Sequence, residues 1–242
     1  MKEAKILGVS FSTLGFNATV SDLVARAEAG QRTHVVTANP EVVMIAKENA
    51  GFQSILDQAY VVPDGIGIVY AAKMLDKPLH ERVTGVELVD ALMQEANTQG
   101  WKVFLLGASP DVNRMAAARL EKDFPGAKIV GRRDGYFSAD EEQLLINEIN
   151  AASPDLLFVA MGVPRQEFWI AKHWSQLNTP IVIGIGGVFD VLAGTVKRAP
   201  VLWQKLHLEW LYRLLRQPSR WKRQLAIPRF VGAVLIEKWG KR

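Results

Sequence analysis

The chain has 242 residues, of which 49% are hydrophobic, enough to bury a full core as one large domain or as one domain with an appendage. It contains no cysteine, which excludes a disulfide framework and thiolate chemistry. The net charge of +4 is unevenly distributed, because residues 197–242 carry 12 Lys and Arg against two Glu, whereas residues 1–196 carry 17 basic and 23 acidic residues.

Short β-rich runs alternate with helical patterns along the first 185 residues. The predicted strands are Ile6–Phe11, His34–Thr37, Tyr60–Val62, Lys102–Leu106, Lys128–Val130, Leu156–Ala160 and Ile181–Ile185. They are continuous Val, Ile and Leu runs, which is typical of parallel strands with both faces covered by helices. The sequence therefore predicts an α/β fold, a Rossmann-like open and mostly parallel sheet flanked by helices.

Helix starts are marked by polar residues before proline or glutamate. Asn39-Pro40 and Ser109-Pro110 each offer an N-cap followed by Pro at the first helical position. Ser138 and Glu141 have the spacing of a capping box. With no repeat and no low-complexity linker, the change of charge sign sets the predicted boundary. We expect a Rossmann-like body at 1–195 and a helical, amphipathic, basic appendage at 196–242.

The appendage combines positive charge with an apolar stripe. Trp203, Leu206, Trp210 and Leu214 follow helical spacing, and four of the seven tryptophans lie in this segment. Its longest apolar run, Phe230 to Ile236, is far below the roughly 18 residues that span a bilayer. This composition suits an anionic surface, either a membrane leaflet or nucleic acid. The alternative is a pair of helices packed on the body, with the charge merely solvated.

Glycine-rich or polar turns follow five of the predicted strands, at residues 37–40, 63–67, 107–109, 162–167 and 184–190. Ligands of open parallel sheets bind beyond the carboxyl ends of the strands, and glycine lets the backbone approach them closely. Together the five turns predict a nucleotide-type ligand. The dinucleotide fingerprint and the P-loop are both absent from the sequence.

The sequence predicts no metal and no other cofactor. It has no Asp-x-Asp pair, and its four histidines lack metal-site spacing. Arginine is then the natural group to neutralise a diphosphate, because its planar fork pairs with phosphate oxygens. The appendage supplies such arginines.

Three of the turns offer candidate catalytic residues. Asp64 is the candidate general base, or else the N-cap of a helix over Ile66–Leu75. Thr37 and Asn39 are candidates to hydrogen-bond a sugar, and the alternative for Asn39 is that it only caps its helix. Gln166 lies in the first turn of a helix, where a solvated surface position is the simpler interpretation.

An ordered set of motifs resembles the WecG/TagA/CpsF family of bacterial glycosyltransferases along essentially the whole chain. The matching segments are Thr37 to Glu41, Pro63 to Gly67, Arg82 to Gly85, Phe104 to Gly107, Gly162 to Glu167, and Gly186 to Pro200. The resemblance implies transfer of N-acetylmannosamine from UDP-N-acetylmannosamine to N-acetylglucosamine on undecaprenyl diphosphate. The β-1,4 link would form with inversion, early in wall teichoic acid linkage-unit synthesis, by a peripheral enzyme at the cytoplasmic face of the cell membrane.

The resemblance also implies roles for particular residues. Asp64 matches the family's base, Thr37 and Asn39 its sugar-contacting turn, and Gln166 a polar active-site residue. Residues expected to bind substrate are Arg82, Gly107, Gly186, Gly187, Asp190, Lys197, Arg198, Arg213, Arg220 and Arg223. The appendage arginines Arg213, Arg220 and Arg223 would complete the site over the diphosphates as a lid resting on lipid.

Other interpretations stay open at this point. A related enzyme of the same fold would use N-acetylmannosaminuronic acid or glucose as the donor sugar. From other classes, the rivals are a basic-tailed nucleic-acid-binding protein and a nonenzymatic nucleotide-binding module. The apolar stripe favours lipid over nucleic acid, so we expect no nucleic-acid partner. A mobile appendage would uncover an apolar stripe on the body and promote homo-oligomers in solution.

Overall fold

The computed structural model describes residues 3–196, 199, 200, 203, 211, 212, 214, 221 and 225–240. Its strands are β1 (Glu3–Ile6), β2 (Val9–Ser12), β3 (Thr33–Ala38), β4 (Tyr60–Pro63), β5 (Lys102–Gly107), β6 (Lys128–Arg133), β7 (Leu156–Ala160) and β8 (Ile181–Gly184). Its helices are α1 (Phe16–Glu28), α2 (Pro40–Glu48), α3 (Ala50–Gln58), α4 (Ile66–Met74), α5 (Gly85–Gln99), α6 (Pro110–Asp123), η1 (Ala139–Glu141), α7 (Glu142–Ala152), α8 (Arg165–His173), α9 (Val188–Leu192) and α13 (Ala226–Trp239).

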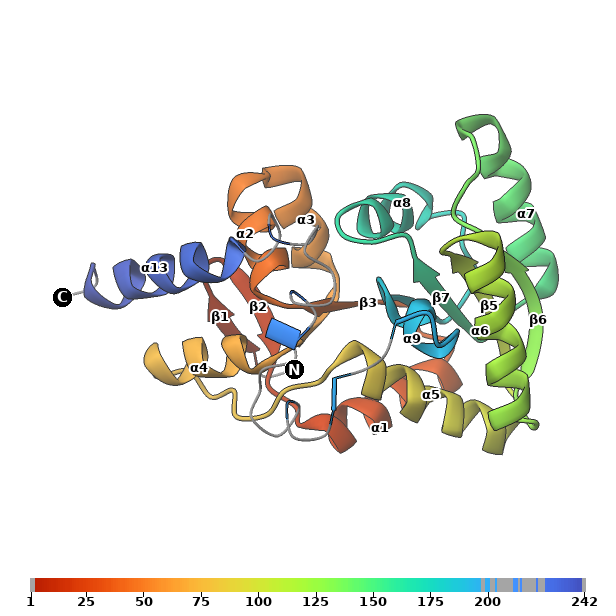
Figure 1. Ribbon diagram of the computed structural model, residues 1–242, viewed down its shortest axis with the longest axis horizontal. Helices are drawn as coiled ribbons and strands as arrows, with labels where there is room; N and C mark the ends of the chain where they lie inside the picture. Colours follow the sequence, from red (N-terminus) through yellow and green to blue (C-terminus); the bar gives the residue numbers. More distant parts are fainter. Residues whose placement is uncertain are drawn as a thin grey trace.

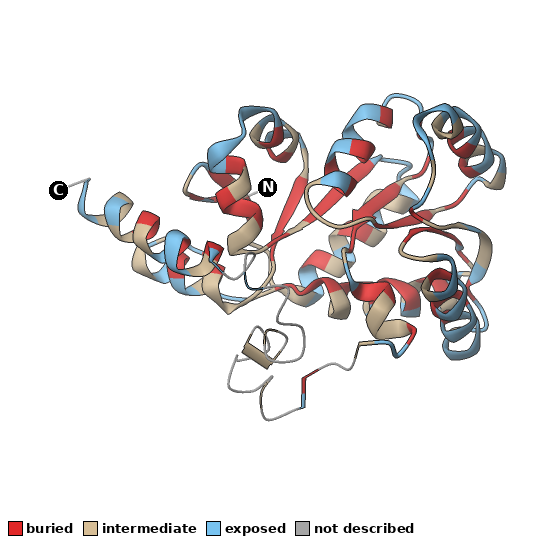
Figure 2. Ribbon diagram, turned by 45° about the horizontal axis from the view of Figure 1, so that its top comes forward, coloured by how far each residue is buried: buried red, intermediate tan, exposed pale blue. Residues whose placement is uncertain are grey.

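The predicted α/β class is confirmed. Strands β3 to β8 form one parallel sheet in the order β4-β3-β8-β7-β5-β6, and helices cover both of its faces (Figure 1). One face packs against α1, α5, α6 and α9, while the other carries two clusters, one under α2, α3 and α4 and one under α7 and α8. The central strands β7 and β8 are buried along their full length, as Figure 2 shows. Burial on both faces explains their continuous apolar sequence.

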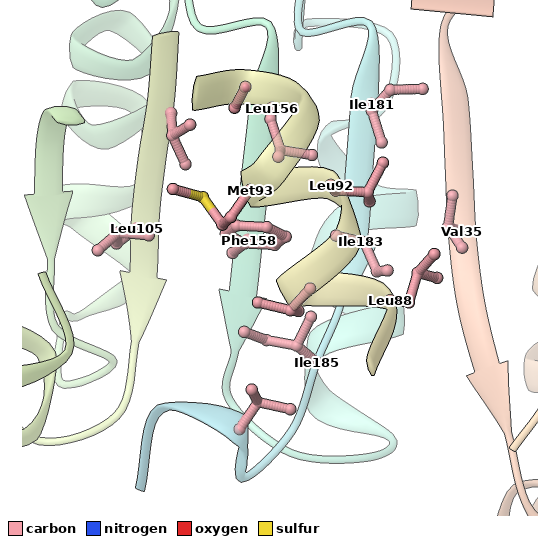
Figure 3. Close-up of a cluster of buried hydrophobic side chains, with 14 of the residues drawn as sticks. Val35, Leu88, Leu92, Met93, Leu105, Leu156, Phe158, Ile181, Ile183 and Ile185 are labelled. Atoms are coloured by element: carbon pink, nitrogen blue, oxygen red, sulfur yellow. The ribbon is translucent and has the colours of Figure 1, made fainter. Parts of the chain in front are cut away.

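Helix α5 crosses the sheet and brings its N-terminus to the strand ends. Leu88, Leu92 and Met93 pack across the strands onto residues such as Phe158 and Ile183 (Figure 3). At the start of the helix, an added Cβ on Gly85 would lie 3.4 Å from the Thr37 Oγ1. The apolar face of α5 therefore fixes the polar residues just before it against the end of β3.

The predicted helix starts are confirmed. The Asn39 Oδ1 accepts hydrogen bonds from the backbone N–H groups of Glu41 and Val42 at 2.9 and 3.2 Å. The Ser109 side chain caps α6, and Ser138 with Glu141 forms the capping box at η1. Side-chain oxygens thus satisfy N–H groups that the first helical turn leaves unpaired.

The predicted first strand, Ile6–Phe11, is wrong. This stretch turns at Leu7 and Gly8, and the flanking residues form the antiparallel pair β1–β2 outside the main sheet. Both turn residues have positive φ, 48° and 94°, the combination found in type I′ hairpin turns.

The last helix of the appendage, α13, packs on the body. Ala226, Phe230 and Val234 join the core cluster beneath α2 and α4, and Arg229 pairs with Glu48 of α2. Glu237 accepts a hydrogen bond from the Leu7 N–H at 3.1 Å, so α13 also holds the β1–β2 turn. None of the described helices combines the length and the apolar character that crossing a bilayer requires.

Candidate active site

The polar turns predicted from the sequence meet at one edge of the sheet. Parallel strands end at the same edge, and the sheet order places the ends of β4, β3, β8 and β7 next to one another. The helices that follow β3 and β7 pack on one face, whereas the helix that follows β8 packs on the other. Such a reversal is where ligands of open α/β sheets bind.

Asp64 lies at the end of β4, half-buried, with its backbone N–H donating to the Ala38 carbonyl at 2.9 Å. The N-cap of α4 is Gly65 at φ 97°, so the alternative that Asp64 occupies the N-cap position is wrong. An added Cβ at Gly65 would meet no atom within 4 Å, so among the described residues this turn is open. A carboxylate is therefore held beside an accessible turn, as a general base requires.

Thr37 and Asn39 flank the end of the neighbouring strand β3. The Thr37 hydroxyl donates to the Gly184 carbonyl of β8 at 3.5 Å, a long contact that leaves it able to serve a ligand. Asn39 does cap its helix through Oδ1. Among the described residues, no group accepts a hydrogen bond from its Nδ2, so capping and sugar binding are compatible for this side chain.

Gln166 is buried, with 2% of its surface exposed, so the surface interpretation is wrong. Its Oε1 accepts hydrogen bonds from two backbone N–H groups, that of Gly162 after β7 at 3.1 Å and that of Gly186 after β8 at 3.0 Å. Its Nε2 donates to the Glu167 Oε1 at 2.7 Å. The side chain thus ties together two strand-end turns.

Glu167 is a residue that sequence reasoning did not assign. It is 1% exposed, and its Oε2 has no hydrogen-bond partner among the described residues. Burial raises the pKa of this carboxyl from 4.5 to about 7, and the charge of Glu41 adds to the increase against the opposing hydrogen bond from Gln166. Near neutral pH, Glu167 therefore exists in both protonation states.

This raised pKa predicts how stability depends on pH. Because the folded state binds the Glu167 proton more tightly than the unfolded chain, its contribution is present below pH 4.5 and is lost as pH rises through about 7. The loss amounts to about 3 kcal/mol. Urea unfolding of the wild type and Glu167→Gln, at several pH values across this range, should show the loss only in the wild type. Parallel pH curves would contradict the assignment.

Arg82 lies just before α5, where its Nη2 is 3.8 Å from the Glu87 Oε1. It borders a groove of about 900 Å³ between α1 and α5, whose lining includes Glu81, Asp90 and Glu95. These carboxylates disfavour a diphosphate inside the groove. The groove itself is therefore an unfavourable place for Arg82 to bind a diphosphate.

The glycines predicted for the donor site differ in whether strand packing or an open surface explains them. An added Cβ on Gly107 would lie 2.4 Å from the Ala160 carbonyl oxygen, so close strand packing explains this glycine. At Gly186, with φ 52°, no described atom lies within 4 Å of such a Cβ. Gly187 is exposed and is the N-cap of the short helix α9, and Asp190 lies in the first turn of that helix. The turn after β8 therefore offers backbone that a ligand can approach.

Five predicted residues, Lys197, Arg198, Arg213, Arg220 and Arg223, lie outside the described part of the chain. Within residues 3–196 and 225–240, no group of three or more His, Asp or Glu side chains is arranged to hold a metal ion.

Comparisons with known proteins identify relatives along the whole chain. A model described as "Glycosyl transferase WecG/TagA/CpsF family" matches residues 4–242. A protein of Bacillus spizizenii is 43% identical over 202 residues, 83% of this chain and 78% of the relative. Relatives from Bacillus subtilis (36% over 209 residues, 86% and 81%) and Staphylococcus aureus (37% over 240 residues, 96% and 92%) are also similar. All three are named N-acetylglucosaminyldiphosphoundecaprenol N-acetyl-beta-D-mannosaminyltransferase.

Proposed function

The chain belongs to the WecG/TagA/CpsF family of glycosyl transferases, and from this membership we propose that it transfers N-acetylmannosamine to N-acetylglucosamine carried on undecaprenyl diphosphate. The observation that carries the proposal is the shared name of relatives that match at least 78% of their own length at 36–43% identity. The product would enter wall teichoic acid linkage-unit synthesis.

The reaction inverts the anomeric centre. The acceptor 4-hydroxyl attacks C1 of the donor sugar from the face opposite the nucleotide, and the C1–oxygen bond breaks with its electron pair leaving on UDP. Asp64 takes the proton of the attacking hydroxyl as the new bond forms. Its place at the end of β4, beside the accessible Gly65 turn, supports this role.

The donor is UDP-N-acetylmannosamine, held where the turn after β8 presents approachable backbone. Gly186, Gly187 and Asp190 line this turn, and Thr37 and Asn39 face the sugar from the end of β3. The negative charge that develops on the departing diphosphate is balanced by Arg213, Arg220 and Arg223, without a metal ion. The supply of arginines in the appendage supports this assignment.

The experiment that tests the function offers a panel of UDP-sugars to the purified protein with a short-chain lipid diphosphate acceptor bearing N-acetylglucosamine. UDP-N-acetylmannosamine should be the preferred donor, at equal rates with EDTA and with Mg²⁺. Preference for the uronic acid or for glucose would identify the alternative donor. Loss of turnover in EDTA, restored by a divalent ion, would refute the metal-independent mechanism.

We assign the enzyme to the cytoplasmic face of the cell membrane, where an undecaprenyl-linked acceptor is anchored. The exposed side of α13 supports membrane contact, because Leu225, Ile236 and Trp239 are 49–72% exposed on the side opposite Phe230. Tryptophan and aliphatic side chains with neighbouring cations are typical of helices at the headgroup boundary.

Weakening this apolar side should reduce membrane binding. Changing Ile236 and Trp239 to serine removes two large apolar groups, which should lower partitioning onto anionic vesicles roughly tenfold or more. Sedimentation with phosphatidylglycerol vesicles measures the effect. Leu144→Ser, at a 70% exposed leucine of α7, is the matched control and should bind like the wild type. Equal binding by all three proteins would remove α13 from this role.

A further inference from the structure

Gln166 and Glu167 form a buried polar pair directly beneath the proposed donor site. The amide oxygen of Gln166 accepts hydrogen bonds from the backbone N–H groups of Gly162 and Gly186, and the amide nitrogen donates a hydrogen bond to Glu167. The oxygen and one N–H of the amide are engaged in this way, and the side chain is buried. These hydrogen bonds act on the two turns.

The surrounding backbone is shaped to admit this pair. At Gly184, the last residue of β8, an added Cβ would lie 2.5 Å from the Gln166 Nε2 and 3.1 Å from the Glu167 Oε1. Glycine at this position leaves the space that both side chains occupy. The Gly184 carbonyl in turn accepts a hydrogen bond from the Thr37 hydroxyl, so the residue that packs against the pair also contacts the end of β3.

Only one protonation state of Glu167 suits the binding of an anion at the turn above it. When neutral, the carboxyl still accepts the Gln166 N–H. When ionised, it places a negative charge two hydrogen bonds away from the Gly186 N–H. The charge that raises the pKa of Glu167 from a neighbouring element is that of Glu41 in α2. The last residues of β3, β7 and β8 carry no titratable side chain, whereas Arg165 follows β7 at the start of α8 and Asp190 follows β8 in α9. An ionised Glu167 therefore repels a diphosphate there.

We propose that the Gln166–Glu167 pair is a positioning device for the donor: neutral Glu167 orients Gln166 so that it fixes the turns after β7 and β8, and loss of the Glu167 proton weakens binding of the UDP-sugar. The proposal rests on the donor site given above. Gln166 and Glu167 are accordingly positioning residues, acting through the Gly162 and Gly186 amides.

The test measures the affinity of UDP-N-acetylmannosamine without acceptor, by calorimetry, from about pH 6 to about pH 8.5. The two phosphates of this diester do not titrate in the range, so a change reports on the protein. In the wild type, Kd should rise roughly fivefold with pH. Glu167→Gln keeps an acceptor for Gln166 and cannot ionise, so its Kd should match the acidic wild-type value throughout. Glu142→Gln, at a carboxylate that contacts the other end of α8, should follow the wild type.

Glu167→Leu removes the acceptor for the Gln166 amide and should bind the donor more weakly at every pH, with circular dichroism reporting whether it folds. If that variant does not fold, Glu167→Gln alone decides the matter. The same pH dependence in Glu167→Gln as in the wild type would overturn the proposal, as would loss of binding by a folded Glu167→Gln at all pH values. A wild-type preference for another UDP-sugar would contradict the donor assignment only, and the pair would then be tested with that nucleotide.

Discussion

Replacement of Asp64 by alanine should lower kcat for sugar transfer by about two to four powers of ten, the usual contribution of a general base. The acceptor hydroxyl is a poor nucleophile until its proton is removed, and Asp64 is the carboxylate held at the end of β4 beside an accessible turn. Because the change affects the chemical step, KM for the donor should move much less than kcat. Single-turnover measurements with the lipid acceptor separate the two.

A matched substitution controls for general effects of removing a carboxylate. Asp155 lies at the opposite edge of the sheet, where its carboxylate accepts the Lys102 N–H at 2.8 Å. Asp155→Asn should therefore leave kcat near the wild-type value, whereas Asp64→Asn should resemble Asp64→Ala. Added formate should restore part of the activity of Asp64→Ala by supplying a base. Undiminished turnover by Asp64→Ala would exclude this residue as the base.

Neutralising Arg213, Arg220 and Arg223 together, each to glutamine, should lower kcat/KM by about three powers of ten. Arginines that stabilise charge on a departing or transferring phosphate contribute on this scale, and the proposed mechanism has no metal ion to replace them. Lysine at the same three positions should restore only part of the activity, because lysine cannot pair with phosphate oxygens in the same planar fork.

Equal charge loss elsewhere in the appendage provides the control. Changing Arg229, Lys238 and Lys241 to glutamine removes the same three charges, and Arg229 is paired with Glu48 on the body. This variant should bind vesicles less well but retain turnover on a soluble short-chain acceptor. If both triple variants lost activity equally on that acceptor, the effect would be one of charge in general, and the three arginines would have no specific place over the diphosphate.

The parts of the fold that depend on local sequence were predictable. Apolar runs identified the six strands of the main sheet, and the caps at Asn39, Ser109 and Ser138 identified helix starts, because each signal acts within a few residues. The hairpin at Leu7 was not predictable in this way. Its turn places a leucine at positive φ, and the side chain that receives its N–H, Glu237, lies 230 positions away along the chain.

In the candidate site, too, the features set by local sequence were predictable and those set by distant contacts were not. The turns containing Thr37, Asn39 and Asp64 were predictable because parallel strands end at one edge. The buried pair was not, since a Gln-Glu sequence in a first helical turn is ordinarily a solvated cap. What buries Gln166 and Glu167 is the approach of the turn after β8, and the glycine at 184 that makes room for them. The sequence shows a glycine at 184, but it does not show that the side chains of Gln166 and Glu167 pack against it.

A structure of Asp64→Asn bound to UDP-N-acetylmannosamine and a short-chain acceptor would show directly whether Asp64 is the base. The acceptor 4-hydroxyl should lie about 3 Å from the side chain at position 64 and in line with C1 and the departing oxygen. A hydroxyl directed at another carboxylate, with position 64 out of reach, would contradict this assignment of the base.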